Sequence, residues 1–215
     1  MEALTRAGER NASTSGEDVG EVIRGSPALT LAPGEVRPAW SLQSAALLGV
    51  EDGFVAVRRT APPARRSVIV DDAAAGGVLL APTPDEELVG LAPSRVRIVS
   101  PAALDRLLSG SAGAHLISDA LASALRRREE LIASLSNARH VERVREKLLR
   151  LACEFGKVDG RGVRIDLPLT HELLAEMVCS ARETVTRAVD ELEREGFVKR
   201  EAGGYRLSVD PQRLV

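Results

Sequence analysis

The stretch that most constrains the fold is residues 170–200, THELLAEMVCSARETVTRAVDELEREGFVKR. Its second half has apolar residues at i, i+3, i+4 and i+7, the spacing of one buried helix face. These residues are Val185, Ala188, Val189 and Leu192. Ahead of them, Thr170 is a good N-cap for a shorter helix that would bury Leu173, Leu174, Met177 and Val178. Only a few residues separate the two segments, so the pattern predicts a helix-turn-helix.

The second predicted helix, at about 181–194, carries polar residues on its outer face. Ser180 and Glu183 fit a capping box, which would start this helix sharply. The outward side chains are Arg182, Glu183, Thr186, Arg187 and Asp190. Arginine can donate two hydrogen bonds to guanine, and glutamate can accept one from cytosine, in the major groove of DNA. We therefore predict that Arg182, Glu183 and Arg187 read base edges.

A hairpin is predicted after Gly196, because apolar and polar residues alternate around Gly203-Gly204. Its basic residues Lys199, Arg200 and Arg206 would contact the phosphate backbone, which fixes register without reading sequence. The alternative is an ordinary amphipathic helix whose charges are only solvated. The order of helix, turn, helix and hairpin favours DNA binding.

The segment Leu169–Val198 resembles the C-terminal domain of the Crp/Fnr family of bacterial transcription regulators. The matching positions are Leu169, Thr170, Leu174, Ala175, Val178, Arg182, Glu183, Thr184, Val185, Arg187, Val189, Leu192 and Gly196. The resemblance implies a winged helix-turn-helix that binds double-stranded DNA, with Thr184 near a phosphate. We also expect phosphate contacts from Thr170, Ser180 and Thr186. Ala181 departs from the family, which usually has serine or threonine at that position.

A long helix is predicted ahead of this segment, with a seam of residues spaced alternately by four and three. The seam comprises Ile117, Leu121, Ala124, Arg128, Leu131 and Leu135. Such a heptad pattern is typical of two paired helices, so it predicts a homodimer, which a palindrome-reading helix-turn-helix also needs. The alternative is that the helix packs against its own N-terminal domain. Arg128 interrupts the seam, and either sets its register or contacts a ligand.

Residues 27–100 have a different sequence pattern, typical of β-strands rather than helices. Short apolar runs are separated by turn signals at Pro33-Gly34, Asp52-Gly53 and Gly76-Gly77, which predicts a small β-barrel or jelly roll. The order of β domain, long helix and winged helix is also that of the Crp/Fnr family. The predicted fold class is α+β. The predicted parts are a flexible tail at 1–16, a β-roll sensor-like domain at 17–115, a dimerisation helix and hinge at 116–138, and the DNA-binding domain at 139–215.

The effector of this β domain is not identified by the sequence. Relatives that bind cyclic AMP carry a phosphate cassette with Gly-Glu and Arg-Ser/Thr-Ala, and residues 67–100 lack it. Arg95 and Arg97 lie in a predicted strand without the flanking residues of that cassette. Cyclic AMP is therefore not expected. The β domain either binds an unidentified small molecule or serves as a structural scaffold in a constitutive regulator.

No cofactor or metal site is predicted. Two cysteines, Cys153 and Cys179, are too few for the four-cysteine iron–sulfur cluster of Fnr-type members, and we interpret them as buried structural thiols. His115 is the one histidine placed even remotely like a haem ligand, and we interpret it as an ordinary histidine. The acidic runs Asp71-Asp72 and Asp85–Glu87 are interpreted as solvated loops rather than a cation site.

Several function classes are excluded or left as rivals. The chain has no window of about 18 apolar residues and no signal peptide, so a cytoplasmic protein without membrane contact is expected. Nucleophile, metalloprotease and phosphate-loop motifs are absent, which argues against an enzyme. The net charge of −2 does not by itself indicate nucleic-acid binding. The rival is a winged-helix protein-interaction module. RNA polymerase is a further expected partner of a transcription regulator.

Overall fold

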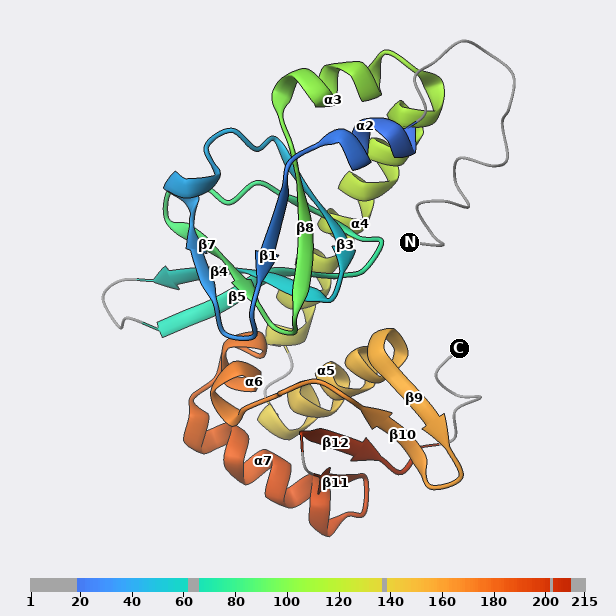
Figure 1. Ribbon diagram of the computed structural model, residues 1–215. Helices are drawn as coiled ribbons and strands as arrows, with labels where there is room; N and C mark the ends of the chain where they lie inside the picture. The colour runs from blue at the N-terminus through green and yellow to red at the C-terminus, as the bar shows by residue number, and fades with distance from the viewer. Residues whose placement is uncertain (1–18, 62–65, 137–138, 202, 210–215) are drawn as a thin grey trace. The chain divides into compact units, whose positions relative to one another are not determined.

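The computed structural model describes residues 19–61, 66–136, 139–201 and 203–209 (Figure 1). The chain forms two compact units, Met1–Thr60 with Val70–Glu129 and Ala61–Ile69 with Glu130–Val215. The predicted tail at 1–16 lies outside the described residues, as do Asn137 and Ala138 of the predicted hinge.

The first unit contains two four-stranded sheets, with strand orders β1-β8-β3-β6 and β2-β7-β4-β5. The strands are β1 (Ala28–Leu31), β2 (Val36–Pro38), β3 (Leu47–Asp52), β4 (Phe54–Ala61), β5 (Arg66–Ala74), β6 (Val78–Leu80), β7 (Glu86–Gly90) and β8 (Ser94–Val99). One core cluster joins Leu48 and Val96 of the first sheet to Val55 and Leu88 of the second. The sheets therefore pack face to face, and the predicted β-roll is confirmed.

The predicted turns of this unit are confirmed by their backbone. Gly34, Gly53 and Gly76 have φ angles of 79°, 84° and 86°, in the region that favours glycine. At Gly53 a Cβ atom would lie 2.2 Å from the carbonyl oxygen of Pro93. This turn between β3 and β4 therefore requires glycine both for its backbone angle and for its close contact.

Asp71, Asp72 and Glu86 are buried in this unit, so their interpretation as solvated loops is wrong, whereas Asp85 is exposed in a turn as interpreted. Asp71 and Asp72 are 4% and 3% exposed within β5, and Glu86 is 7% exposed. Arg127 reaches the first of them from the long helix α4 (Ser111–Ser136), with 2.6 Å between its Nε and Oδ1 of Asp71. Arg59 pairs with Glu86 at 3.0 Å. These carboxylates lie on strands rather than in turns, and a buried charge of this kind needs a partner.

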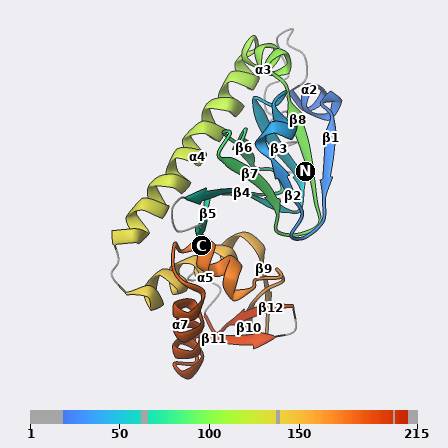
Figure 2. The same ribbon diagram turned by 90° about the vertical axis from the view of Figure 1, so that its left-hand side faces the viewer.

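The described helices of this unit are α2 (Val19–Gly25), the 3-10 helix η1 (Ala39–Leu42), α3 (Pro101–Leu108) and α4. Helices α2, α3 and α4 share one core cluster, whereas η1 packs against β2 and β7. Ser100 caps α3 by accepting from the Ala103 N–H at 3.2 Å. At Gly113 a Cβ atom would lie 2.0 Å from the carbonyl oxygen of Leu107, so glycine permits the sharp passage from α3 to α4. Figure 2 shows α4 running alongside the β domain. Among the described helices, none is long and apolar enough to cross a membrane.

The predicted seam on α4 is partly wrong. Ile117 and Ala124 are 7% and 3% exposed, and Ile117 belongs to a core cluster with Val99 and Leu107 of its own unit. Leu131 is half-buried. Leu121 and Leu135 of the predicted seam do face outward, exposed by 41% and 43%, and so do Leu125 and Ile132, which the prediction left out, exposed by 62% and 68%. Together with Arg128 they form a stripe spaced alternately by four and three, which we call the exposed stripe.

The second unit has three helices and one four-stranded sheet of order β11-β12-β10-β9. Its elements are α5 (His140–Phe155), β9 (Gly156–Asp159), β10 (Gly162–Ile165), α6 (His171–Met177), α7 (Arg182–Arg194), β11 (Val198–Glu201) and β12 (Gly204–Leu207). Leu148 and Leu151 of α5 are fully buried, as are Val185 and Leu192 of α7. The hairpin predicted around Gly203-Gly204 is confirmed as β11 and β12. The strands β9 and β10 were not predicted from the sequence.

Candidate nucleic-acid interface

Helices α6 and α7 form the predicted helix-turn-helix. Thr170 is the N-cap of α6, and its side chain accepts from the Leu173 N–H at 3.1 Å. The predicted apolar stripe of α7 is confirmed, since Val185, Ala188, Val189 and Leu192 are all buried. In α6, Leu174, Met177 and Val178 are buried as predicted, whereas Leu173 is only half-buried. The buried stripe fixes which side chains of α7 face outward.

The capping box predicted for α7 is wrong. The N-cap residue is Ala181, which has no side-chain oxygen to accept from the first turn. Ser180 instead hydrogen-bonds through Oγ to Nδ1 of His140, the first residue of α5, at 3.0 Å. Because its hydroxyl is engaged by the ring, Ser180 ties the turn to α5, and its contact with a phosphate remains a prediction.

Cys179, in the turn between α6 and α7, has a φ of 49°, the left-handed region that side chains with a Cβ atom avoid. It is half-buried, and burial raises the pKa of its thiol. Cys153 is exposed, so its predicted burial is wrong. Neither cysteine forms a disulfide bond, and among the described residues no group of His, Cys, Asp and Glu side chains is arranged to hold a metal ion.

Replacement of Cys179 by glycine is expected to stabilise the second unit by about 1 kcal/mol, because glycine adopts the left-handed conformation without steric cost. Thermal unfolding of the variant measures this as a higher Tm. Cys179→Ala is the matched control, since it removes the same thiol but keeps the Cβ atom. A glycine variant no more stable than the alanine variant would show that the turn is unstrained.

The three predicted base readers lie together on the outer face of α7. Arg182, Glu183 and Arg187 are exposed, and their side chains make no hydrogen bond or ion pair with any residue that the structure describes. Because no intramolecular partner holds them, all three side chains are available to an external one.

The threonines predicted to contact phosphates have different surroundings. Thr186 donates its hydroxyl proton to the carbonyl oxygen of Arg182 at 3.0 Å. His171 then donates from Nδ1 to the same hydroxyl at 2.9 Å, which joins α6 to α7. Burial and the nearby Arg200 lower the pKa of His171. Thr186 is therefore committed to the helix pair, whereas Thr170 is exposed and Thr184 is half-buried.

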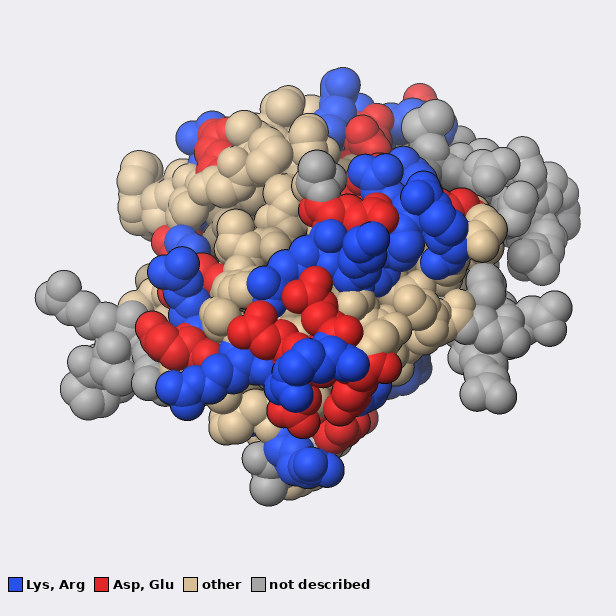
Figure 3. Space-filling model, turned by 90° about the horizontal axis from the view of Figure 1, so that it is seen from below, with Lys and Arg blue, Asp and Glu red and all other residues tan. Residues whose placement is uncertain are grey.

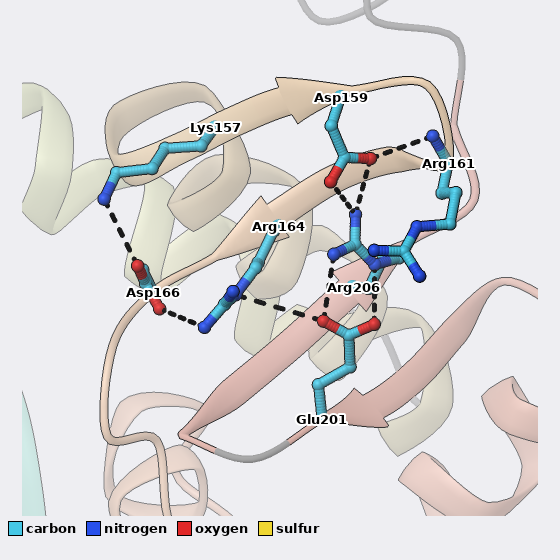
Figure 4. Close-up of polar contacts among 7 residues, drawn as sticks. All are labelled: Lys157, Asp159, Arg161, Arg164, Asp166, Glu201 and Arg206. Carbon is cyan, nitrogen blue, oxygen red and sulfur yellow. Dashed lines mark hydrogen bonds and ion pairs between the residues drawn. The ribbon is translucent and has the colours of Figure 1, made fainter.

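The basic residues of the hairpin, which we call the wing (Val198–Leu207), fall into two groups. Lys199 is exposed and pairs with none of the described carboxylates. Arg200 pairs with Asp190 and, at 3.5 Å, with Glu193, both on α7. Arg206 is only 5% exposed and is bound on both sides by carboxylates (Figure 4). Its predicted phosphate contact is therefore wrong, because the guanidinium is covered and already neutralised.

Basic and acidic side chains are interleaved on the face shown in Figure 3. A surface that bound DNA through its positive charge alone would be uniformly basic. Here the distinguishing property is which basic side chains have no carboxylate partner among the described residues. These include Arg182 and Arg187 on the outer face of α7 and Lys199 on the wing.

Comparison with known proteins agrees with this geometry. A family model described as the Crp-like helix-turn-helix domain matches residues 142–215, from α5 through the wing. The CRP-like cAMP-activated global transcriptional regulator of Mycobacterium tuberculosis is 35% identical over 94 residues, which cover 44% of this chain and 42% of that protein. Residues 142–215 therefore form a Crp-like helix-turn-helix domain.

Other relatives agree with this match. The global nitrogen regulator of Synechocystis is 38% identical over 81 residues, which cover 38% of this chain and 36% of that protein. The chain thus spans about two-fifths of the length of the curated Crp/Fnr relatives that it matches. FixK2 from Bradyrhizobium japonicum has a TM-score of 0.70 at 22% identity, covering 88% of this chain and 95% of that one. A CooA mutant from Carboxydothermus hydrogenoformans has a TM-score of 0.71 at 18% identity, covering 93% and 90%. These structures show that the Crp/Fnr fold extends over both units.

Proposed function

We propose that this protein is a DNA-binding transcription regulator of the Crp/Fnr type, which reads a palindromic site as a homodimer. The observation that carries the proposal is the unpaired trio of Arg182, Glu183 and Arg187 on the outer face of α7. Arg145, Arg200 and Arg206 of the same unit are bound by carboxylates. A helix that leaves a base-reading set unpaired fits entry into a major groove.

The exposed stripe of α4 supports the homodimer. Its four large apolar side chains are all more than 40% exposed in the single chain. Two copies of α4 packed side by side would bury them, and this burial would also place two recognition helices on one duplex. Arg128 interrupts the stripe, and its Nε is buried without a hydrogen-bond partner among the described residues. A role for Arg128 in dimer register or in ligand contact is therefore part of the proposal.

The effector is left unassigned and is proposed not to be cyclic AMP. The arginines of β8 are already engaged: Arg97 binds Glu51 at 2.7 Å and the carbonyl oxygens of Arg24 and Ser26 at 2.9 and 3.1 Å. Arg95 also pairs with Glu51, at 3.2 Å. We further propose that the protein has no catalytic activity, works in the bacterial cytoplasm and has RNA polymerase as a partner.

The Arg182→Ala variant is expected to lose about 1–3 kcal/mol of discrimination at one G·C pair, because a bidentate contact to guanine is removed. Lys199→Ala is expected to weaken binding to all sequences alike and to reduce the salt dependence by about one phosphate contact.

The target is first obtained by selecting bound fragments from genomic DNA, with and without cell metabolites. Affinities for the selected site, its single-base variants and a random duplex then separate the two roles. Equal losses on specific and random DNA for both variants would refute the assignment.

A further inference from the structure

The outer face of the four-stranded sheet β11-β12-β10-β9 carries a row of four basic residues. Arg164 is paired directly opposite Arg206 and Lys157, and Arg206 is opposite Lys199. Residues opposite one another in antiparallel strands share a face, so one row of positive charge crosses all four strands. Like charges in such positions destabilise a sheet unless counter-charges neutralise them.

Three carboxylates of the same face supply these counter-charges, as Figure 4 shows. Asp166 lies at 3.2 Å from Lys157 and 2.8 Å from Arg164. Asp159 and Glu201 both bind Arg206. The cluster therefore has an edge group around Asp166 and a central group around Arg206, which Arg164 links through its ion pair with Glu201 at 3.9 Å.

Arg206 makes four hydrogen bonds in this central group. Its Nη1 donates to both carboxylate oxygens of Asp159 at 2.7 and 2.6 Å. Its Nε and Nη2 donate to the two oxygens of Glu201 at 2.7 and 3.0 Å. The guanidinium thus joins β12 to β11 and to the end of β9, and it contributes to lowering the pKa of both carboxyl groups. Planar, two-sided binding of this kind fixes orientation as well as distance.

The inner face of the wing is held by a second arginine. The Arg200 N–H donates to Oε1 of Glu193 at 2.9 Å, and its guanidinium binds Asp190 and Glu193. Both carboxylates belong to α7, the helix that carries the proposed base readers. The first strand of the wing is therefore attached to this helix, while Arg206 attaches the two strands of the wing to each other and to β9.

We propose that Arg206 and Arg200 are positioning residues, which hold the wing at a fixed place beside α7, and that their carboxylate partners are required for DNA binding. This inference rests on the proposed function. It has an unusual consequence, because neutralising a carboxylate near DNA ordinarily strengthens binding by removing repulsion from the phosphates. Here the loss of a carboxylate that holds Arg206 weakens binding.

The test measures the affinity of full-length protein for its selected site and for a random duplex. Glu201→Gln and Asp159→Asn, which remove partners on two different strands, are each expected to lose about tenfold on the specific site, comparable to one charge-assisted contact. The loss on random DNA should be smaller. Arg206→Lys is expected to lose as much, because an ammonium group keeps the charge but cannot hold two carboxylates in a plane.

Asp166→Asn is the matched control, since it neutralises a carboxylate of the same face that does not touch Arg206. Its affinity is expected to equal or slightly exceed that of the wild type. Circular dichroism verifies that each variant is folded at the assay temperature, and amide exchange is expected to be faster in β11 and β12 of Glu201→Gln. The positioning role is overturned if Glu201→Gln and Asp159→Asn bind as tightly as the wild type, or if all three acid variants weaken alike. A wild-type protein that prefers no duplex would instead overturn the proposed function, and this role with it.

Discussion

Replacing Leu125 by arginine is expected to convert the protein from a dimer to a monomer. Leu125 is 62% exposed and lies within the exposed stripe of α4. An arginine there would face its copy on the partner helix, where two charges would be buried without a counter-charge. Analytical ultracentrifugation should show half the wild-type mass. Affinity for the palindromic site should fall by about 10²–10⁴-fold, because two linked half-site contacts become independent.

Ala133→Arg is the matched control, since Ala133 is also exposed on α4 but lies on a different side of the helix from the exposed stripe. It adds the same side chain and is expected to leave both the mass and the affinity unchanged. A Leu125→Arg protein of dimeric mass would show that α4 is not the pairing surface. Loss of the dimer in both variants would show that the added charge acts without regard to its place on the helix.

The exposed stripe also shows how much of a helix's packing can be predicted from the spacing of its apolar residues. The α7 stripe was predicted correctly because its apolar residues lie on one side of the helix only. On α4 two apolar stripes overlap: Ile117 and Ala124 pack within their own unit, whereas Leu125 and Ile132 face outward. Both stripes have heptad spacing and share Leu121, Arg128 and Leu135, so spacing alone does not identify the outward one. The alternative of packing against the chain's own domain was thus correct for one side of the helix.

The short strands β9 and β10 were missed for a related reason. Each has four residues, and their pattern of burial is weak because Val158 at the sheet edge is 63% exposed while Val163 is 1% exposed. Alternation over so few residues is not a distinctive signal. Their existence matters to the site, because Asp159 at the end of β9 is one of the two carboxylates that hold Arg206.

At the candidate interface, residue types were predictable but their partners were not. Sequence identified Arg182, Arg187, Arg200 and Arg206 alike as basic residues of a DNA-binding domain. Only the structure separates the first two, which are unpaired, from the last two, which are bound by carboxylates. One signal was available: the predicted hairpin places Lys199 directly opposite Arg206, and such a pair implies a nearby counter-charge.

Removal of the Arg127 side chain is expected to destabilise the β domain by about 3–5 kcal/mol, the usual cost of leaving one charge of a buried pair unpaired. The side chain of Asp71 is 1% exposed, and Arg127 donates to it and to the carbonyl oxygen of Val78 at 3.1 Å. Burial raises the pKa of Asp71, Arg127 lowers it, and the neighbouring Asp72 and Arg128 raise and lower it further. In Arg127→Ala the opposing effect of the cation is lost. Urea unfolding at neutral pH measures the change.

The pH dependence of that loss follows from the raised pKa. A carboxyl group whose folded pKa exceeds its unfolded value stabilises the fold below the unfolded pKa, and this stabilisation is lost as the pH rises through the folded pKa. The penalty of Arg127→Ala should therefore be largest at neutral pH and shrink on acidification, as Asp71 takes up a proton. The double variant Asp71→Val with Arg127→Met should recover most of the stability, because it replaces the buried pair by apolar groups. Arg126→Ala, at an exposed neighbouring position, should change stability by no more than about 0.5 kcal/mol. A penalty that grows on acidification, or that persists in the double variant, would show that Arg127 acts by packing rather than by neutralising Asp71.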